Sequence, residues 1–322
     1  MMMDYGAAPD PGNLLQMIEK AYGLRLILTR TRVGPHSTVL FLDGQNASFV
    51  GKVFVSNDRD RIDESFRLSE KAAAHGCPVV LPIRPAPEFD GRRTLGVAFG
   101  ERAAWFSLFP FIDGDSFAPG RVDQIRSAGQ SLARLHLSGP TSETKRKGAG
   151  AFSDFAENIS TMRANVLFAR LLDRIDIGHF AVTVEHLCHG DYRAQNLIYI
   201  GHRVRGIIDF DDACFTSRLW DLAYAIVFFG AGIAPTPALP AERTAFVRAY
   251  HRTYALTDDD LERLPSYLCW ATVRGLSLWR RLITSAPAEV RARLEAWSCS
   301  YVPAAEWSAN VTSDQLRDLI DE

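Results

Sequence analysis

Hydrophobic and polar positions divide the chain into a strand-rich first third and a helical remainder. Short stretches of apolar and β-favouring residues, separated by turn residues, predict five strands. They cover residues 25–31, 37–42, 48–55, 94–99 and 103–109. A short helix near 13–22 precedes them, and a run of helix formers over 60–75 ends at Gly76. The pattern predicts a five-stranded antiparallel sheet with one helix between its third and fourth strands.

After residue 109 the apolar positions recur at helical spacing. The helical segments expected from this spacing are residues 121–136, 152–180, 241–255, 261–284 and 290–305. One β-rich stretch, 197–210, is set among them and predicts a hairpin that turns at Gly201-His202. We therefore expect an α+β protein with two lobes, residues 1–108 and the mainly helical 115–322. A connector at 109–114 would join the lobes, and ligands would bind between them.

Composition limits the class of protein and its partners. The 322 residues are 47% hydrophobic and 23% charged, which is ordinary for a folded protein. A net charge of −2 predicts no nucleic-acid or membrane partner, and no apolar run reaches the ~20 residues of a membrane-spanning helix. Five cysteines without CxxC pairing argue against disulfides and zinc. We expect a cytoplasmic protein; its oligomeric state is not set by these features.

Candidate chemistry gathers in His189–Asn196 (HGDYRAQN) and in the segment that follows the hairpin. Phosphoryl transfer from ATP needs one carboxylate that accepts the proton of the attacking hydroxyl. It also needs a second carboxylate and an amide oxygen that hold Mg²⁺. Asp191, Asn196 and Asp209 supply this set, and the hairpin would return Asp209 to Asn196. The neighbouring acidic pair 211–212 is expected to be a turn or to support the site.

Four features of this region occur in a fixed order: His-Gly-Asp-x-x-x-x-Asn, a hairpin, Ile-Asp-Phe, and Trp220–Ala223 (WDLA). Together they resemble the aminoglycoside phosphotransferase and choline kinase-like superfamily. The resemblance implies a protein-kinase-like fold, ATP and Mg²⁺ as cofactors, Asp191 as catalytic base, and Asn196 and Asp209 as metal ligands. His189 and Asp221 are expected to brace the catalytic loop. His136, at the end of an amphipathic helix, is expected to be a packed structural residue.

A lone lysine, Lys52, interrupts an otherwise apolar strand over residues 49–55. Such a charge is costly unless it meets a phosphate or a carboxylate. The resemblance implies that Lys52 binds the α- and β-phosphates and that its carboxylate partner lies on the following helix. Glu64 fits the family's spacing, and Glu70 remains the alternative.

The resemblance also implies two further nucleotide contacts. The turn between the first two strands, which contains Gly34, His36 and Ser37, would cover the phosphates. Residues 107–114 are similar to the family's interlobe hinge, where adenine would pair with the carbonyl of Pro110 and the N–H of Ile112.

The expected function is transfer of the ATP γ-phosphate to a hydroxyl of a small polar metabolite or antibiotic. A Ser/Thr kinase acting on a peptide or protein acceptor is the enzymatic alternative. A nucleotide-binding pseudokinase that serves as an interaction module is the alternative from another class. An acidic wall at Asp258–Asp260 would suit a cationic acceptor, although an exposed helix start explains it better. Arginines on the helix around Arg274 would suit a carboxylate-bearing acceptor.

Overall fold

The computed structural model describes residues 12–34, 37–54, 58–99, 102–139, 166–180, 184–229, 240–285, 291, 295 and 302–321. The chain divides into two compact units. One contains Met1–Ala73 and Val79–Asp113, and the other contains Ala74–Pro78 and Gly114–Glu322. The junction after Asp113 falls within the predicted connector, while the extent of the two lobes stays a prediction.

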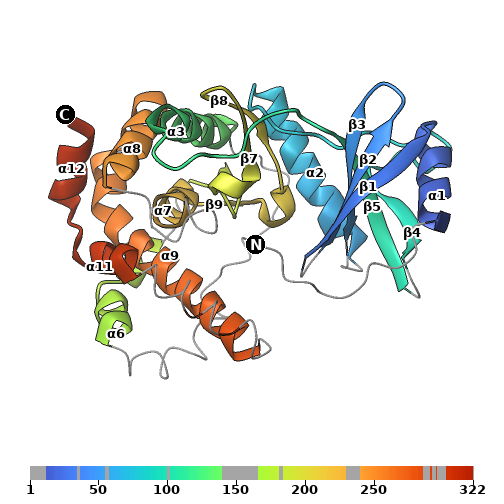
Figure 1. Cartoon of the computed structure of the whole chain (residues 1–322). Coiled ribbons are helices and arrows are strands. Elements are labelled where there is room, and N and C mark those ends of the chain that lie inside the picture. Colours follow the sequence, from blue (N-terminus) through green and yellow to red (C-terminus); the bar gives the residue numbers. More distant parts are fainter. Residues whose placement is uncertain are drawn as a thin grey trace. The chain divides into compact units, whose positions relative to one another are not determined.

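The first unit is built on a five-stranded antiparallel sheet of order β1-β2-β3-β5-β4 (Figure 1). The strands are β1 Leu26–Val33, β2 Ser37–Gly44, β3 Ser48–Phe54, β4 Leu95–Phe99 and β5 Arg102–Pro110. The sheet confirms the predicted fold class. Lys52 pairs with Val39 on β2 and with Ser107 on β5, so its strand is central.

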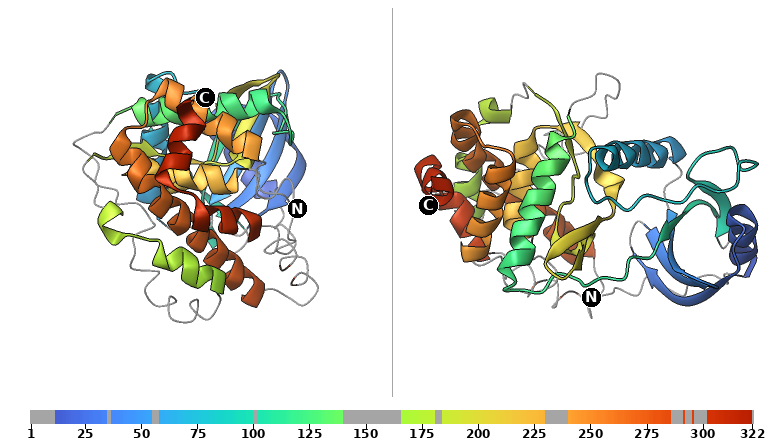
Figure 2. Two further views of the ribbon diagram at one scale, coloured as in Figure 1. Left: turned by 90° about the vertical axis from the view of Figure 1, so that its left-hand side faces the viewer. Right: turned by 90° about the horizontal axis from the view of Figure 1, so that it is seen from above.

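A helix packs on each face of this sheet. Helix α1, Gly12–Tyr22, covers one face and contributes Leu14 and Ile18 to a core that includes Val53 and Phe106 (Figure 2). Gly51 lines the same face, where a Cβ would lie 2.6 Å from the Phe106 ring. Lys52 lies between Gly51 and Val53 on β3. Because successive side chains of a strand alternate between faces, Lys52 lies on the opposite face.

Helix α2, Arg59–Ala74, packs on that opposite face. Its Ile62 and Phe66 are buried with Phe54 at the end of β3, and Trp105 and Phe109 of β5 pack against this cluster. Gly76 follows the helix with a positive φ of 80°, the conformation that glycine adopts most readily. The helix predicted over 60–75 is therefore present, and Lys52 lies on the face that it covers.

Helices dominate the described part of the second unit. They are α3 Val122–Leu137, α6 Val166–Asp173, α7 Arg218–Phe228, α8 Pro240–Thr253, α9 Asp258–Ser285, α11 Val302–Asn310 and α12 Ser313–Asp321. Helix α3 packs against α8, and α7 against α9 (Figure 2). Of the predicted helix 152–180, the described part comprises α6 and a short 3₁₀ turn, Ile177–Phe180. Most of the predicted helix 290–305 lies outside the described residues.

Two short antiparallel pairs of strands carry the loops of interest. The predicted hairpin is β7 Leu197–Ile200 with β8 Arg203–Ile207. The second pair, β6 His186–Cys188 with β9 Cys214–Thr216, was not predicted. Three-residue strands are too short to show the alternation on which strand prediction depends.

No helix within the described ranges is both long and apolar enough to cross a membrane. Four cysteines in these ranges, Cys77, Cys188, Cys214 and Cys269, are buried free thiols.

Candidate active site

The loop that carries Asp191 begins directly after β6. Its first turn depends on Gly190, which has a φ of 84° and where a Cβ would collide with the backbone oxygen of Asp212. The backbone N–H groups of His189 and Gly190 donate to the two carboxylate oxygens of Asp221 on α7, at 2.6 and 2.9 Å. A side chain far along the chain therefore sets the path of the loop, as expected for Asp221.

Asp221 stays a charged acceptor although it is fully buried. Burial alone would raise the pKa of this carboxyl, but hydrogen bonding and charge from His136, with a contribution from His189, hold the pKa below its usual value. His189 closes the loop from the other side, since its Nδ1 accepts the N–H of Asp191 at 3.2 Å and its Nε2 lies 2.9 Å from the carbonyl of Ile208. These contacts agree with a bracing role for both residues.

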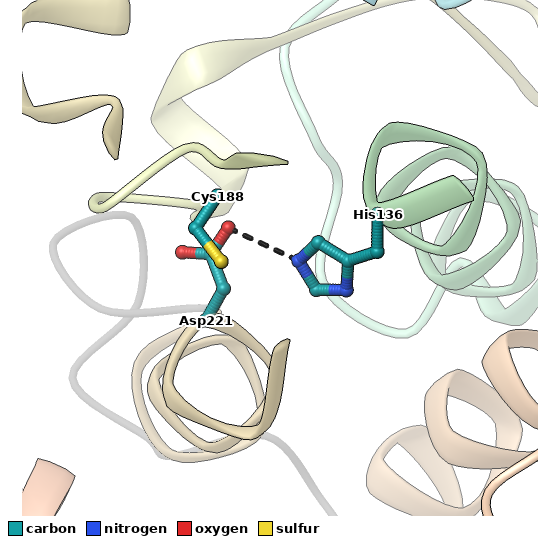
Figure 3. A group of neighbouring side chains, drawn as sticks. All are labelled: His136, Cys188 and Asp221. Atoms are coloured by element: carbon teal, nitrogen blue, oxygen red, sulfur yellow. Dashed lines mark hydrogen bonds and ion pairs between the residues drawn. The ribbon is translucent and has the colours of Figure 1, made fainter. Parts of the chain in front are cut away.

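His136, Cys188 and Asp221 approach one another closely enough to share a metal ion (Figure 3). The side chains of His136 and Cys188 instead make hydrogen bonds to other groups of the protein. His136 Nδ1 lies 2.7 Å from the Tyr250 hydroxyl and Nε2 lies 3.4 Å from Asp221. Cys188 Sγ donates to the carbonyl of Ser217 at 3.6 Å, and burial raises the pKa of its thiol well above the ordinary value. A protonated thiol is a poor ligand, so we interpret the cluster as structural.

His186, which lies beside this cluster, should make the free energy of unfolding depend on pH. Burial lowers the pKa of His186 to about 4, helped by the charges of His136 and Arg218. Because an unfolded histidine titrates near pH 6.5, the unfolded chain binds more protons as pH falls below that value. Stability should therefore drop from about pH 6.5 towards pH 4, with about 2 kcal/mol lost through His186 at pH 5.

Urea unfolding at pH 7 and pH 5 measures this loss. In His186→Gln the difference between the free energies of unfolding at pH 7 and pH 5 should shrink by about 2 kcal/mol. His202→Gln is the matched control, because its side chain is exposed on the β7–β8 turn. An unchanged difference in the His186 variant would contradict the assigned cause.

Asp191 itself is held by three donors. The Tyr224 hydroxyl donates to Oδ1 at 2.9 Å, while Asn196 Nδ2 and Arg193 Nη2 contact Oδ2 at 3.0 and 2.9 Å. The side chain keeps 18% of its surface exposed. The carboxylate is therefore oriented by the protein yet still reachable by another molecule.

Asn196 and Asp209 are brought together by the hairpin, as predicted. The N–H of Ile208 donates to the carbonyl of Asn196 at 3.0 Å, which places the next residue, Asp209, beside that asparagine. Asp209 has the left-handed backbone angles φ 68° and ψ 57°, an uncommon conformation for a residue other than glycine. A 3₁₀ turn, Phe210–Asp212, follows and contains the acidic pair 211–212.

Asn196 and Asp209 offer the kind of oxygen ligands that Mg²⁺ prefers. Asn196 Nδ2 donates to both the carbonyl and the carboxylate of Asp191, at 2.8 and 3.0 Å. Both amide hydrogens are thereby used, which leaves the amide oxygen of Asn196 as an acceptor. That oxygen and the Asp209 carboxylate are hard ligands of the kind that Mg²⁺ prefers, with water completing its shell.

Two residues around Asp191 escaped the sequence-based prediction. Burial by itself would lower the pKa of Arg193, but the charges of Asp191 and Asp209, together with the hydrogen bond to Asp191, outweigh it and raise that pKa. Arg193 lies inside the motif, so its position was the available signal. Tyr224 follows the WDLA element one residue later and one helical turn after Asp221, and only the structure brings it to Asp191.

In the first unit, Lys52 Nζ lies 4.9 Å from the centre of the Phe54 ring. Of its two possible partners on α2, Glu70 pairs with Arg84 at 3.0 Å and with Arg93. Glu64 is 13% exposed, its Oε2 lies 2.5 Å from Arg67, and its buried Oε1 has no hydrogen-bond partner. The unsatisfied oxygen favours Glu64, and its pairing with Lys52 stays a prediction.

The predicted nucleotide-binding turn and hinge are described in part. Gly34 donates its N–H to the carbonyl of Ser37 at 2.8 Å and closes the β1–β2 turn, while His36 lies outside the described residues. After Pro110, the last residue of β5, the N–H of Phe111 donates to Ser48 at 3.0 Å. The two backbone groups expected to pair with adenine are the carbonyl of Pro110 and the N–H of Ile112. Their contact with adenine stays a prediction.

Comparisons with known proteins point in one direction. Residues 32–264 match the family described as "Phosphotransferase enzyme family" (APH). A homoserine kinase of Methylobacillus flagellatus is 26% identical over 275 residues, which cover 81% of this chain and 82% of the relative.

Solved structures share the fold. A microcompartment-associated aminopropanol kinase superposes with a TM-score of 0.72 at 18% identity, over 96% of this chain and 99% of that one. An amicoumacin kinase, in complex with AMP-PNP, Ca²⁺ and Ami, has a TM-score of 0.68 at 14% identity and covers 91% of this chain and 93% of its own.

Proposed function

Because the chain belongs to the phosphotransferase enzyme family, we propose that it transfers the γ-phosphate of ATP to a hydroxyl of a small polar molecule, with Mg²⁺ as the metal. The observation that carries this proposal is the arrangement around Asp191. A partly exposed carboxylate, held by three donors, lies next to Asn196, and the hairpin returns the backbone of Asp209 to that asparagine. This is the set of groups that phosphoryl transfer to an alcohol requires.

In the proposed reaction Asp191 binds the acceptor hydroxyl and takes its proton. The acceptor oxygen forms a bond to the γ-phosphorus, the bond from that phosphorus to the β–γ bridging oxygen breaks, and the electron pair stays with ADP. Asn196 and Asp209 would hold Mg²⁺, which when bound offsets the negative charge of the phosphates. Lys52 would contact the α- and β-phosphates, and Arg193 keeps a positive charge beside the catalytic carboxylate.

The acceptor is proposed to be a small hydroxylated metabolite, and homoserine is the first compound to test, because a homoserine kinase matches four fifths of the chain. One of the three aspartates at the start of α9, Asp260, is used within the protein. Asp260 caps its own helix by accepting the N–H of Thr257 at 2.8 Å, and it pairs with the buried Arg218. Arg274 lies 5.2 Å above the Trp220 ring, and its positive charge would suit an acceptor with a carboxylate.

An acceptor screen tests this function. Homoserine, aminopropanol, hydroxylated antibiotics and Ser/Thr peptides are each supplied with Mg·ATP, and ADP release is compared with phosphate found on the acceptor. Phosphorylation of a small alcohol supports the proposal. Transfer only to peptides would favour the protein-kinase alternative. Nucleotide binding without transfer to any compound would favour the pseudokinase alternative.

Substitutions in the first unit test the role of Lys52. Lys52→Met should raise KM for ATP and lower kcat together, because the lysine both positions the phosphates and stabilises their charge during transfer. Glu64→Gln should have the same effect more weakly. Glu70→Gln is the matched control on the same helix and should change little, since Glu70 pairs with Arg84 and Arg93. A larger loss from Glu70→Gln than from Glu64→Gln would reverse the assignment.

A further inference from the structure

The two oxygens of the Asp191 carboxylate are not equivalent. Each carboxylate oxygen can accept about two hydrogen bonds. Oδ2 already has two donors, Asn196 Nδ2 at 3.0 Å and Arg193 Nη2 at 2.9 Å. Oδ1 has one protein donor among the described residues, the Tyr224 hydroxyl at 2.9 Å. Oδ1 is therefore the oxygen with room for a further hydrogen bond.

We propose that Oδ1 of Asp191 accepts the proton of the acceptor hydroxyl and that Tyr224 is the positioning residue that aims this oxygen. The inference rests on the proposed function, since it assigns an atom and a supporting residue to that reaction. The proton moves from the acceptor oxygen to Oδ1 as that oxygen bonds to the γ-phosphorus, and ADP leaves with the electron pair. Oδ2 stays bound to Asn196 and Arg193 throughout.

Helix α7 links the two parts of this arrangement. Asp221 and Tyr224 lie one helical turn apart on α7, so they share a face of the helix. Asp221 binds the backbone of the loop through His189 and Gly190, and Tyr224 binds the side chain of Asp191. One rigid helix thereby sets both the path of the loop and the orientation of its carboxylate.

The environment of Tyr224 keeps its hydroxyl a donor. Burial and the neighbouring Asp191 charge raise the pKa of Tyr224, so the phenol stays protonated. Its ring packs 5.1 Å from the Phe228 ring, which restricts the direction of the hydroxyl. A protonated, immobilised phenol suits a positioning role.

Tyr224→Phe tests the proposal because it removes the hydroxyl and keeps the ring. We expect kcat for the acceptor found in the screen to fall about tenfold, in keeping with one lost hydrogen bond to a charged group. KM for ATP and calorimetric binding of Mg·ATP should not change. Tyr199→Phe is the matched control, because Tyr199 is a buried tyrosine whose hydroxyl has no hydrogen-bond partner. Its kcat should equal that of the wild type.

A second readout separates positioning from loss of folded protein. If Asp191 is misaligned, water should compete better with the acceptor hydroxyl for the γ-phosphate. The ratio of ADP released to acceptor phosphorylated should therefore rise in Tyr224→Phe. A substitution that only destabilised the fold would lower both rates equally and leave the ratio unchanged. An unchanged kcat, or a lower kcat with an unchanged ratio, would overturn the inference while the proposed function stands. Absence of transfer in the wild type would instead overturn the proposed function.

Discussion

Replacing Asp191 with asparagine should lower kcat by about 10² or more while the affinity for ATP changes little. The asparagine keeps a side chain of the same shape, and the loop should keep its path because Asp221 holds its backbone through His189 and Gly190. It removes the negative charge and the proton acceptor. Initial rates with the acceptor from the screen, together with calorimetric binding of Mg·ATP, measure the two parts of this expectation.

The matched control is Asp123→Asn on α3, which neutralises an exposed carboxylate paired with Arg126 at 3.0 Å. Its turnover should match that of the wild type, since exposed ion pairs contribute little. If Asp191→Asn retained more than about a tenth of the wild-type kcat, the loss would be smaller than a general base supplies, and the base would have to be another residue.

Loss of the Asp209 charge should abolish Mg²⁺-dependent nucleotide binding, because this carboxylate is the proposed anionic ligand of the metal. Asp209→Asn is preferable to Asp209→Ala for this purpose. The residue has a left-handed backbone, with a φ of 68°, which asparagine tolerates better than alanine does. Calorimetric titration of ATP with and without Mg²⁺ should show a metal-dependent difference in the wild type and none in the variant.

Two further variants sharpen this test. Asn196→Ala should weaken Mg·ATP binding less, since Asn196 offers a neutral amide oxygen. Asp211→Asn, two residues from Asp209, is the control for a nearby change of charge and should leave binding unchanged. If Asp209→Asn bound Mg·ATP normally while Asp211→Asn did not, the metal site would belong to the 3₁₀ turn that follows Asp209.

Much of the architecture followed from local pattern. Alternating apolar positions predicted the sheet, and helical spacing predicted α2, α3, α8 and α9 with ends that differ by a few residues. The family match confirmed the resemblance that the catalytic motif had indicated. Four elements were missed: the strands β6 and β9 and the helices α7 and α12. The two strands are three residues each and are stabilised by a partner distant in sequence.

The sequence by itself determined the association of Asn196 with Asp209, because a short hairpin joins them and its register is local. It also placed a lone charge at Lys52 in an otherwise apolar strand, since alternation assigns each position of a strand to a face. Residues close in sequence, or spaced by a regular element, need only local geometry to be predicted.

Only the tertiary structure decided which distant side chains complete the site. Tyr224 reaches Asp191 across 33 residues, and His136 reaches Asp221 across 85. Such contacts depend on how helices pack and on which rotamers the packing allows, and no periodicity in the chain records either. Glu64 and Glu70 both fit the helix, and only the structure shows that arginines from another segment bind Glu70 while a buried oxygen of Glu64 has no hydrogen-bond partner. The pairing of Lys52 with Glu64 stays a prediction.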